Sequence, residues 1–103
     1  MRQVIDGKVY DDEKAERIDG YCNGLSKSDF NWIDEALYRT ENGRFFLSGS
    51  GGGLTEYAKP YEGGRGSCGG ERIIPLSTEE ARGWCERHST AKIIERYFEV
   101  EEA

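Results

Sequence analysis

Residues 35–48 read Glu-Ala-Leu-Tyr-Arg-Thr-Glu-Asn-Gly-Arg-Phe-Phe-Leu-Ser, and this stretch decides the fold. Its two halves, 35–40 and 44–48, contain aromatic and aliphatic residues of the kind that favour strands. Between them stand Asn42 and Gly43, the residue pair most typical of a tight turn between antiparallel strands. The stretch therefore predicts a β-hairpin.

The side chains of this hairpin also indicate where the core lies. With a two-residue loop, Tyr38 is expected opposite Leu47 and Glu41 opposite Arg44, which makes one aromatic–aliphatic pair and one pair of opposite charges. Five of the 12 aromatic residues of the chain lie in and just before the hairpin, within residues 30–47. The core is therefore expected around Trp32, Tyr38, Phe45, Phe46 and Leu47.

Two further segments are predicted to form strands. Residues 4–10 contain Asp6 and Gly7 at their centre, and Asp-Gly supplies the positive φ angles of a tight hairpin turn. Residues 72–76 read Arg-Ile-Ile-Pro-Leu, which is typical of a strand, but Pro75 has no backbone N–H to donate. This second segment is therefore expected at the edge of the sheet or at the end of its strand.

Three short helices are predicted to cover one face of the sheet. The segment 12–19 begins with acidic residues, which suit a helix N-terminus, and Gly20 can end it. Residues 78–88 follow Ser77, which forms a capping box with the glutamate three residues later. Residues 91–99 complete the set. The sequence thus predicts an α+β fold: a small antiparallel sheet built on the Asn-Gly hairpin, with about three helices.

Residues 48–70 hold most of the 14 glycines of the chain. Because glycine loses more conformational freedom on ordering than any other residue, this stretch is expected to be a mobile loop. Such loops often carry binding residues. The whole chain, 1–103, is expected to form one domain that ends in a frayed acidic tail over 99–103.

The net charge of the chain is −6, and it is unevenly spread. Residues 1–38 hold nine acids and five bases, and residues 77–103 hold seven acids and four bases. Direct binding of DNA or RNA is disfavoured, because phosphate contacts need a basic surface. Either the acidic ends are solvated surface, or they compete for the basic groove of a nucleic-acid-binding partner.

Cysteine usage and hydropathy exclude several classes of protein. Three cysteines, Cys22, Cys68 and Cys85, without an export signal predict reduced thiols in the cytoplasm. The longest apolar runs are too short for a secretory signal or a membrane span. One histidine cannot complete a structural zinc site with thiols so widely spaced. No metal and no cofactor are therefore predicted.

One letter motif points to nucleophilic catalysis. Residues 66–70 read Gly-Ser-Cys-Gly-Gly, which has the spacing of a nucleophile elbow with Cys68 as the nucleophile. His88, the only histidine, would have to serve as its base. The alternative is that Cys68 is an incidental thiol and that His88 ends the apolar stripe of its helix.

Three side chains beside the glycine runs are of types enriched at interaction hot spots. They are Tyr57, Tyr61 and Arg65. Their position predicts that they bind a partner. The alternative is that Tyr57 anchors the loop to the sheet.

The order of several motifs resembles a group of short, uncharacterised proteins encoded in bacterial genomes and mobile elements. The motifs are Gly7-Lys8-Val9-Tyr10-Asp11, Leu37-Tyr38-Arg39-Thr40 with Asn42-Gly43-Arg44-Phe45-Phe46-Leu47, and Ile74-Pro75-Leu76-Ser77 with Glu79-Glu80-Ala81. The resemblance implies a protein of the bacterial cytoplasm, or of a host cytoplasm if a mobile element encodes it. It carries over no catalytic residue. Small acidic proteins of this kind often resemble inhibitors of host defence, anti-CRISPR proteins among them.

The leading expectation is a non-catalytic inhibitor of a bacterial defence complex that occupies a basic surface on its protein partner. The partner is expected to be a CRISPR–Cas or other nucleic-acid-processing complex, with no direct contact to nucleic acid or membrane. A small enzyme using Cys68 and His88 is the alternative, and an interaction module or homo-oligomer using the edge strand near Pro75 is a third. The partner-binding residues are expected to be Asp11, Asp12, Glu13, Glu16, Tyr57, Tyr61, Arg65, Glu79, Glu80 and Glu86.

Overall fold

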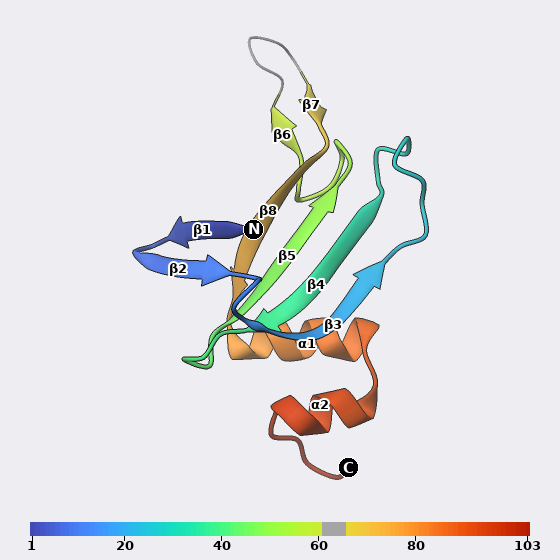
Figure 1. The fold of residues 1–103 in the computed structure, drawn as a ribbon. Helices are drawn as coiled ribbons and strands as arrows, with labels where there is room; N and C mark the ends of the chain where they lie inside the picture. Colours follow the sequence, from blue (N-terminus) through green and yellow to red (C-terminus); the bar gives the residue numbers. More distant parts are fainter. Residues whose placement is uncertain (61–65) are drawn as a thin grey trace.

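A four-stranded antiparallel sheet lies at the centre of the computed structural model, which describes residues 1–60 and 66–103 (Figure 1). The sheet order is β3-β4-β5-β8, so β3 and β8 form its edges. These strands are β3 (Glu16–Cys22), β4 (Ile33–Arg39), β5 (Phe45–Gly51) and β8 (Gly70–Leu76).

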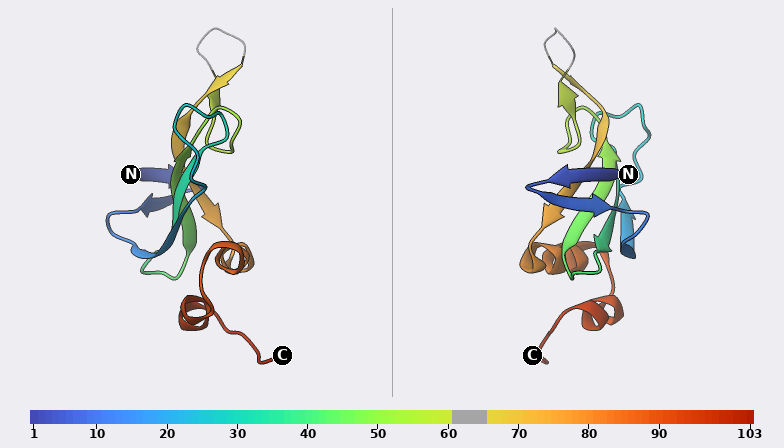
Figure 2. Two further views of the ribbon diagram at one scale, coloured as in Figure 1. Left: turned by 90° about the vertical axis from the view of Figure 1, so that its right-hand side faces the viewer. Right: turned by 60° about the vertical axis from the view of Figure 1, so that its left-hand side comes forward.

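Two short hairpins and two helices surround this sheet. They are β1 (Arg2–Ile5) with β2 (Lys8–Asp11), β6 (Lys59–Pro60) with β7 (Ser67–Cys68), α1 (Thr78–His88) and α2 (Ala91–Tyr97). Figure 2 shows the β1–β2 hairpin on one face of the sheet and α1 on the other. The fold is therefore α+β, as predicted, with the sheet covered on both faces.

The larger part of the core lies between the sheet and the helices. Alternate residues of β4 and β5 point toward α1. They pack against the apolar stripe of this helix, which the spacing of its apolar residues predicts. The buried members of this cluster are Ile18, Leu37, Phe45, Leu47, Ala81, Trp84, Cys85 and Phe98. The C-terminal end of the chain is tied to the sheet here, because the Phe98 ring stacks on Phe45 at 5.1 Å between centroids.

A smaller cluster covers the opposite face of the sheet. Phe46 and Ile73 are buried there beneath Tyr10 of the β1–β2 hairpin. The Tyr10 ring meets Phe46 edge-on at 5.5 Å, and Tyr38 stacks on the same ring at 5.3 Å. The predicted core residue Phe46 therefore belongs to this second cluster rather than to the one under the helices.

Local turn and cap signals in the sequence are confirmed. Asp6 and Gly7 both have positive φ, 52° and 74°, as the turn between β1 and β2 requires. Ser77 caps α1, and Glu80 completes the predicted capping box by accepting a hydrogen bond from the Ser77 backbone. The helix then runs over the predicted residues 78–88. The next helix, α2, ends at Tyr97, two residues earlier than predicted.

The register of the central hairpin differs from the prediction by one residue. Tyr38 lies opposite Phe46, and Leu37 lies opposite Leu47. The loop has three residues, because the Thr40 amide donates to the Arg44 carbonyl oxygen at 2.8 Å. Within this loop only Gly43 has a positive φ, 82°, which is typical of a type I turn closed by a glycine bulge rather than the two-residue turn.

The helix predicted over 12–19 is wrong. Residues 12–15 form a turn, and β3 then pairs with β4 from Glu16 to Cys22, with a bulge between Arg17 and Asp19. The acidic residues that suggested a helix start thus precede a strand. Ladder hydrogen bonds to β4 outweigh a weak helix propensity, so two helices form instead of three.

The edge strand β8 offers few free backbone donors. The outward-facing amide of Ile73 donates to the side-chain oxygen of Gln3 at 2.7 Å. Two residues later on the same edge, Pro75 has no amide hydrogen. The position of Pro75 on an edge strand confirms the prediction for residues 72–76.

The glycine-rich stretch 48–70 is partly built into the sheet. Its first residues complete β5, and Gly70 begins β8. The turn after β5 is held by backbone hydrogen bonds from Gly52 to Trp32 and from Leu54 to Phe30, both at 2.9 Å. The described part of this stretch therefore has a defined path against the loop that precedes β4.

Candidate functional site

A groove of about 780 Å³ lies between α1 and the uncovered part of the sheet. One wall is a face of α1, and the other contains Glu56 from the loop after β5. Side chains of β4, β5 and β8 form the floor. The lining residues are Tyr21, Ile33, Glu35, Leu47, Glu56, Ile74, Leu76, Glu79, Glu80, Gly83, Trp84, Arg87 and His88.

At the bottom of the groove, Glu35 is a buried carboxylate with only 7% of its surface exposed. The indole nitrogen Nε1 of Trp84 donates to one of its oxygens at 2.8 Å. The Tyr57 hydroxyl donates to the other oxygen. Both oxygens are thus satisfied by neutral donors from α1 and from the loop, which allows a carboxylate to lie in the core.

This network depends on a close approach between the loop and β5. Tyr57 is 1% exposed and lies over Gly49. A Cβ atom on Gly49 would lie 2.7 Å from both the Tyr57 hydroxyl oxygen and the Glu35 Cβ. The missing side chain of Gly49 is therefore what makes room for the tyrosine. Burial and the bond to Glu35 raise the pKa of Tyr57.

The electrostatics of the groove are negative. Four carboxylates and one guanidinium line it, together with His88. Partial burial and the neighbouring Glu35 raise the pKa of Glu56, which stands exposed at the rim. Burial and the adjacent Arg87 lower the pKa of His88, so the imidazole is mainly neutral at pH 7.

His88 itself is fixed by aromatic contacts. Its ring stacks on Tyr21 at 3.8 Å between centroids and meets Trp84 edge-on at 5.2 Å. These contacts place the histidine at the end of the groove, as the continuation of the apolar stripe of α1. They account for it as a packed side chain.

The sequence-predicted pair Cys68 and His88 is not brought together. Cys68 lines a separate cavity of about 370 Å³ together with Lys27 and Trp32, whereas His88 lines the groove beside α1. Figure 1 shows β7, which contains Cys68, beyond one end of the central sheet and α1 across the other end. The geometry gives Cys68 no histidine base in this arrangement.

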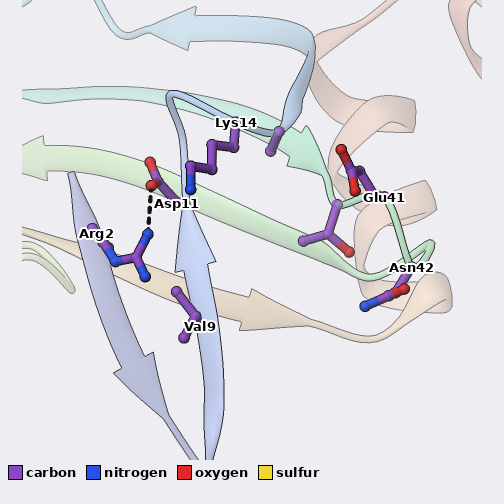
Figure 3. Close-up of a pocket in the computed structure, with 8 residues that line it drawn as sticks. Arg2, Val9, Asp11, Lys14, Glu41 and Asn42 are labelled. Atoms are coloured by element: carbon purple, nitrogen blue, oxygen red, sulfur yellow. Dashed lines mark hydrogen bonds and ion pairs between the residues drawn. The ribbon is translucent and has the colours of Figure 1, made fainter.

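Asp11, one of the two aspartates predicted to bind a partner, is engaged within the chain. Asp11 forms an ion pair with Arg2 at 3.2 Å, beside Lys14 and across a cavity of about 290 Å³ from Glu41 (Figure 3). The Glu13 amide and Arg2 both donate to Asp11 and hold the pKa of its carboxyl below the usual range. Charges around this cavity are therefore nearly balanced.

The other aspartate, Asp12, accepts hydrogen bonds from two directions. Its carboxylate contacts the amino group of Met1 and the hydroxyl of Ser48, both at 2.6 Å. These contacts join the turn after β2 to β1 and to the centre of β5. Asp12 therefore has a structural role as a link between these segments.

The remaining predicted acids are exposed, and several gather around the helices. Tyr97 of α2 donates to Glu16 at 2.9 Å, and Ser89 after α1 donates to Asp19 at 2.6 Å. These bonds bring the start of β3, from the acidic N-terminal third, against the acidic C-terminal helices. Exposed acids without such a structural bond include Glu13, Glu79 and Glu86.

The three loop candidates have different outcomes. Tyr57 is buried and anchors the loop to the sheet, which is the alternative role considered for it. Tyr61 and Arg65 lie outside the described residues. Of the three, only Tyr57 therefore has a structural role that can be assigned.

Within residues 1–60 and 66–103, no group of three or more His, Cys, Asp or Glu side chains is placed to hold a metal ion. Neither helix in this part of the chain is long and apolar enough to cross a membrane. No protein-family model matches the chain, and comparison with curated proteins and with solved structures gives no significant match.

Sequence reasoning missed Glu35 as part of a site. The sequence of β4 contains one signal for this role. Ile33, Glu35 and Leu37 stand at every second position, so their side chains lie on the same side of the strand. A glutamate at an inward-facing position must find donors inside the protein. Its donors come from residues far along the chain, so their identity could not be read from this pattern.

Proposed function

We propose that this protein is a non-catalytic binding protein that acts by occupying a basic surface on a protein partner. The observation that supports this most directly is the junction of two acidic segments. Glu16 and Asp19 of β3 are hydrogen-bonded to Tyr97 and Ser89 beside the helices. We use the name acidic end for the exposed carboxylates of Glu16, Glu86, Glu95, Glu99, Glu101 and Glu102.

A surface of this charge favours a partner whose own surface is basic. Proteins that bind nucleic acids carry such surfaces, because phosphate neutralisation requires lysine and arginine. An acidic protein that covers the surface competes with the nucleic acid for the same cations. The finer proposal is therefore an inhibitor of a nucleic-acid-processing complex, such as a bacterial defence complex of the CRISPR–Cas type.

The proposed function is tested by capturing partners from bacterial lysate with the tagged protein at low and at raised salt. The test variant is E86K/E95K, which reverses two exposed charges of the acidic end outside the groove. The matched control is D34K/E71K, which changes the net charge equally at exposed positions of β4 and β8.

The expected result is a nucleic-acid-binding protein that is retained at low salt, released at raised salt, lost by E86K/E95K and kept by D34K/E71K. Screening of surface charges explains the release. Equal retention of the captured protein by both variants would show that total charge, or another surface, accounts for binding. Capture of nothing at either salt would remove the proposal.

A further inference from the structure

A glycine stands in the middle of α1 where the fold itself does not need one. Gly83 is the sixth residue of this 11-residue helix. Glycine in a helix interior is destabilising relative to alanine, because glycine loses more conformational freedom on folding. A Cβ atom added to Gly83 would meet only the mobile end of the Arg87 side chain, at 3.5 Å, which is an ordinary contact.

This glycine contrasts with Gly49, where a Cβ atom would collide with the protein's own side chains. Packing explains the glycine in β5 but not the glycine in α1. Gly83 lines the groove, on the same wall as Glu79, Glu80 and Trp84. The missing side chain on this wall leaves the helix backbone open to close approach by another molecule in the groove.

The floor of the groove indicates the apolar part of that occupant. Ile74 and Leu76 of β8 and Ile33 of β4 are only partly buried, although they face the helix side of the sheet. Covering them would bury apolar surface that the chain alone leaves in contact with water. An aliphatic side chain inserted between β8 and α1 would do so.

The walls indicate the charged part. Four carboxylates against one guanidinium give the lining a net charge of about −3 when His88 is neutral. Glu56 and Glu79 are exposed on the loop wall and on the helix wall, where they can meet cations from either side. Lysine or arginine beside the aliphatic side chain complements this arrangement.

We propose that the groove binds an extended segment of the partner protein in which lysine or arginine residues alternate with aliphatic ones. Aliphatic side chains lie on the floor at Ile74 and Leu76, and the cations face Glu56 and Glu79. The backbone of the segment passes against α1 at Gly83. This inference rests on the proposed function, because it names the part of the basic partner that the chain recognises.

The probe is a fluorescein-labelled decapeptide that alternates lysine with leucine. Two control peptides of equal length alternate lysine with serine and glutamate with leucine. Binding is measured by fluorescence anisotropy, and the site is located from amide shifts and from the Trp84 indole signal in nitrogen–proton NMR spectra. The lysine–leucine peptide is expected to bind more tightly than both controls and to shift groove residues.

Two variants test the shape and the charge of the groove separately. Gly83→Ala should raise the urea midpoint of unfolding and weaken the lysine–leucine peptide about tenfold, because the added methyl group obstructs the wall. Glu79→Gln should weaken it about threefold, whereas Glu86→Gln, on the same helix but outside the lining, should leave it unchanged. A gain in stability together with a loss of binding excludes misfolding as the cause.

The proposal is overturned if the peptide shifts residues outside the groove, if no peptide causes any shift, or if Gly83→Ala binds as tightly as the wild type. The proposed function can survive this failure. In that case G83A would still retain the lysate partner that E86K/E95K loses. Loss of the partner by E86K/E95K and G83A alike, with the peptide on the groove, supports both.

Discussion

The Tyr57 hydroxyl donates a hydrogen bond to the buried carboxylate of Glu35, which joins the loop after β5 to the centre of β4. Together with the Trp84 indole, it gives each carboxylate oxygen one donor. The loop, the sheet and α1 are therefore held at one point. The depth of the groove and the position of Glu56, the residue before Tyr57, both depend on this point.

Tyr57→Phe is expected to lower the free energy of unfolding by about 1–3 kcal/mol, because it leaves one oxygen of a buried carboxylate without its donor. Urea denaturation at pH 7 measures the loss. Tyr97→Phe makes the same chemical change at an exposed hydrogen bond to Glu16 and should cost less than about 0.5 kcal/mol. Equal effects of the two variants would contradict the role assigned to the Glu35 network.

Gly49→Ala is expected to destabilise the protein by about 1–3 kcal/mol, since its Cβ atom would press on Glu35 and on Tyr57. The same substitution at Gly83 should stabilise it. Combining Gly49→Ala with Tyr57→Phe should cost less than the two single changes together, because the phenylalanine lacks the hydroxyl oxygen that the methyl group meets. Additive losses in urea denaturation would show that the two residues do not interact.

Cys85 is expected to be inert in the folded protein. Burial, reinforced by Asp19 and Glu86, raises the pKa of its thiol to about 11, so about one molecule in a thousand carries the thiolate at pH 8. A C22S/C68S variant isolates this thiol for labelling with a chromogenic disulfide. The reaction should proceed only as fast as unfolding permits, and rapid labelling at pH 8 without urea would refute the burial.

The same shift predicts how stability responds to alkali. The folded-state pKa of Cys85 lies above the ordinary value of 9.0, so the unfolded state loses its proton first as pH rises. The contribution of this thiol to stability should be complete below pH 9 and decline toward pH 11. Urea midpoints for C22S/C68S across that range should fall more steeply than those of a variant that also carries Cys85→Ala.

His88 should make the protein less stable in mild acid. Burial and Arg87 lower the pKa of its imidazole, although Glu35 opposes them, so the unfolded chain takes up the proton more readily. The free energy of unfolding should therefore fall as pH drops below about 6.5, and the contribution should be complete above it. The His88→Phe variant keeps a ring against Tyr21, and its free energy of unfolding should fall less between pH 7 and pH 5. If the urea midpoints of the two proteins changed equally between pH 7 and pH 5, the lowered pKa of His88 would be contradicted.

Short-range features of this fold could be predicted because all their parts are neighbours in sequence. The turn at Asp6-Gly7 and the Ser77–Glu80 box each need only a few consecutive residues. The same reasoning gave a hairpin at Asn42-Gly43 but not its register. A two-residue and a three-residue loop both suit that pair, and the pairing of whole strands decides between them.

The errors arise where distant residues decide. Nothing near residues 12–19 shows that β4 lies beside them, yet that neighbour makes the segment a strand. Likewise, the two donors to Glu35 are distant in sequence: Tyr57 follows it by 22 residues and Trp84 by 49 residues. The apolar stripe of α1 could be predicted from its period, but not that its Trp84 indole would reach a carboxylate.

The hydrogen bond between Gln3 and Ile73 affects how readily two copies of this protein can associate through the edge strand β8. An edge strand with unpaired amides is a template on which a strand of another chain can be added, and repeated addition leads to cross-β aggregates. On β8 the outward-facing amide of Ile73 is bonded to Gln3, and the next outward-facing residue, Pro75, has no amide hydrogen. The N-terminal hairpin thus hinders the addition of another strand at the β8 edge of the sheet, because the side-chain amide of Gln3 takes the place of a neighbouring strand there.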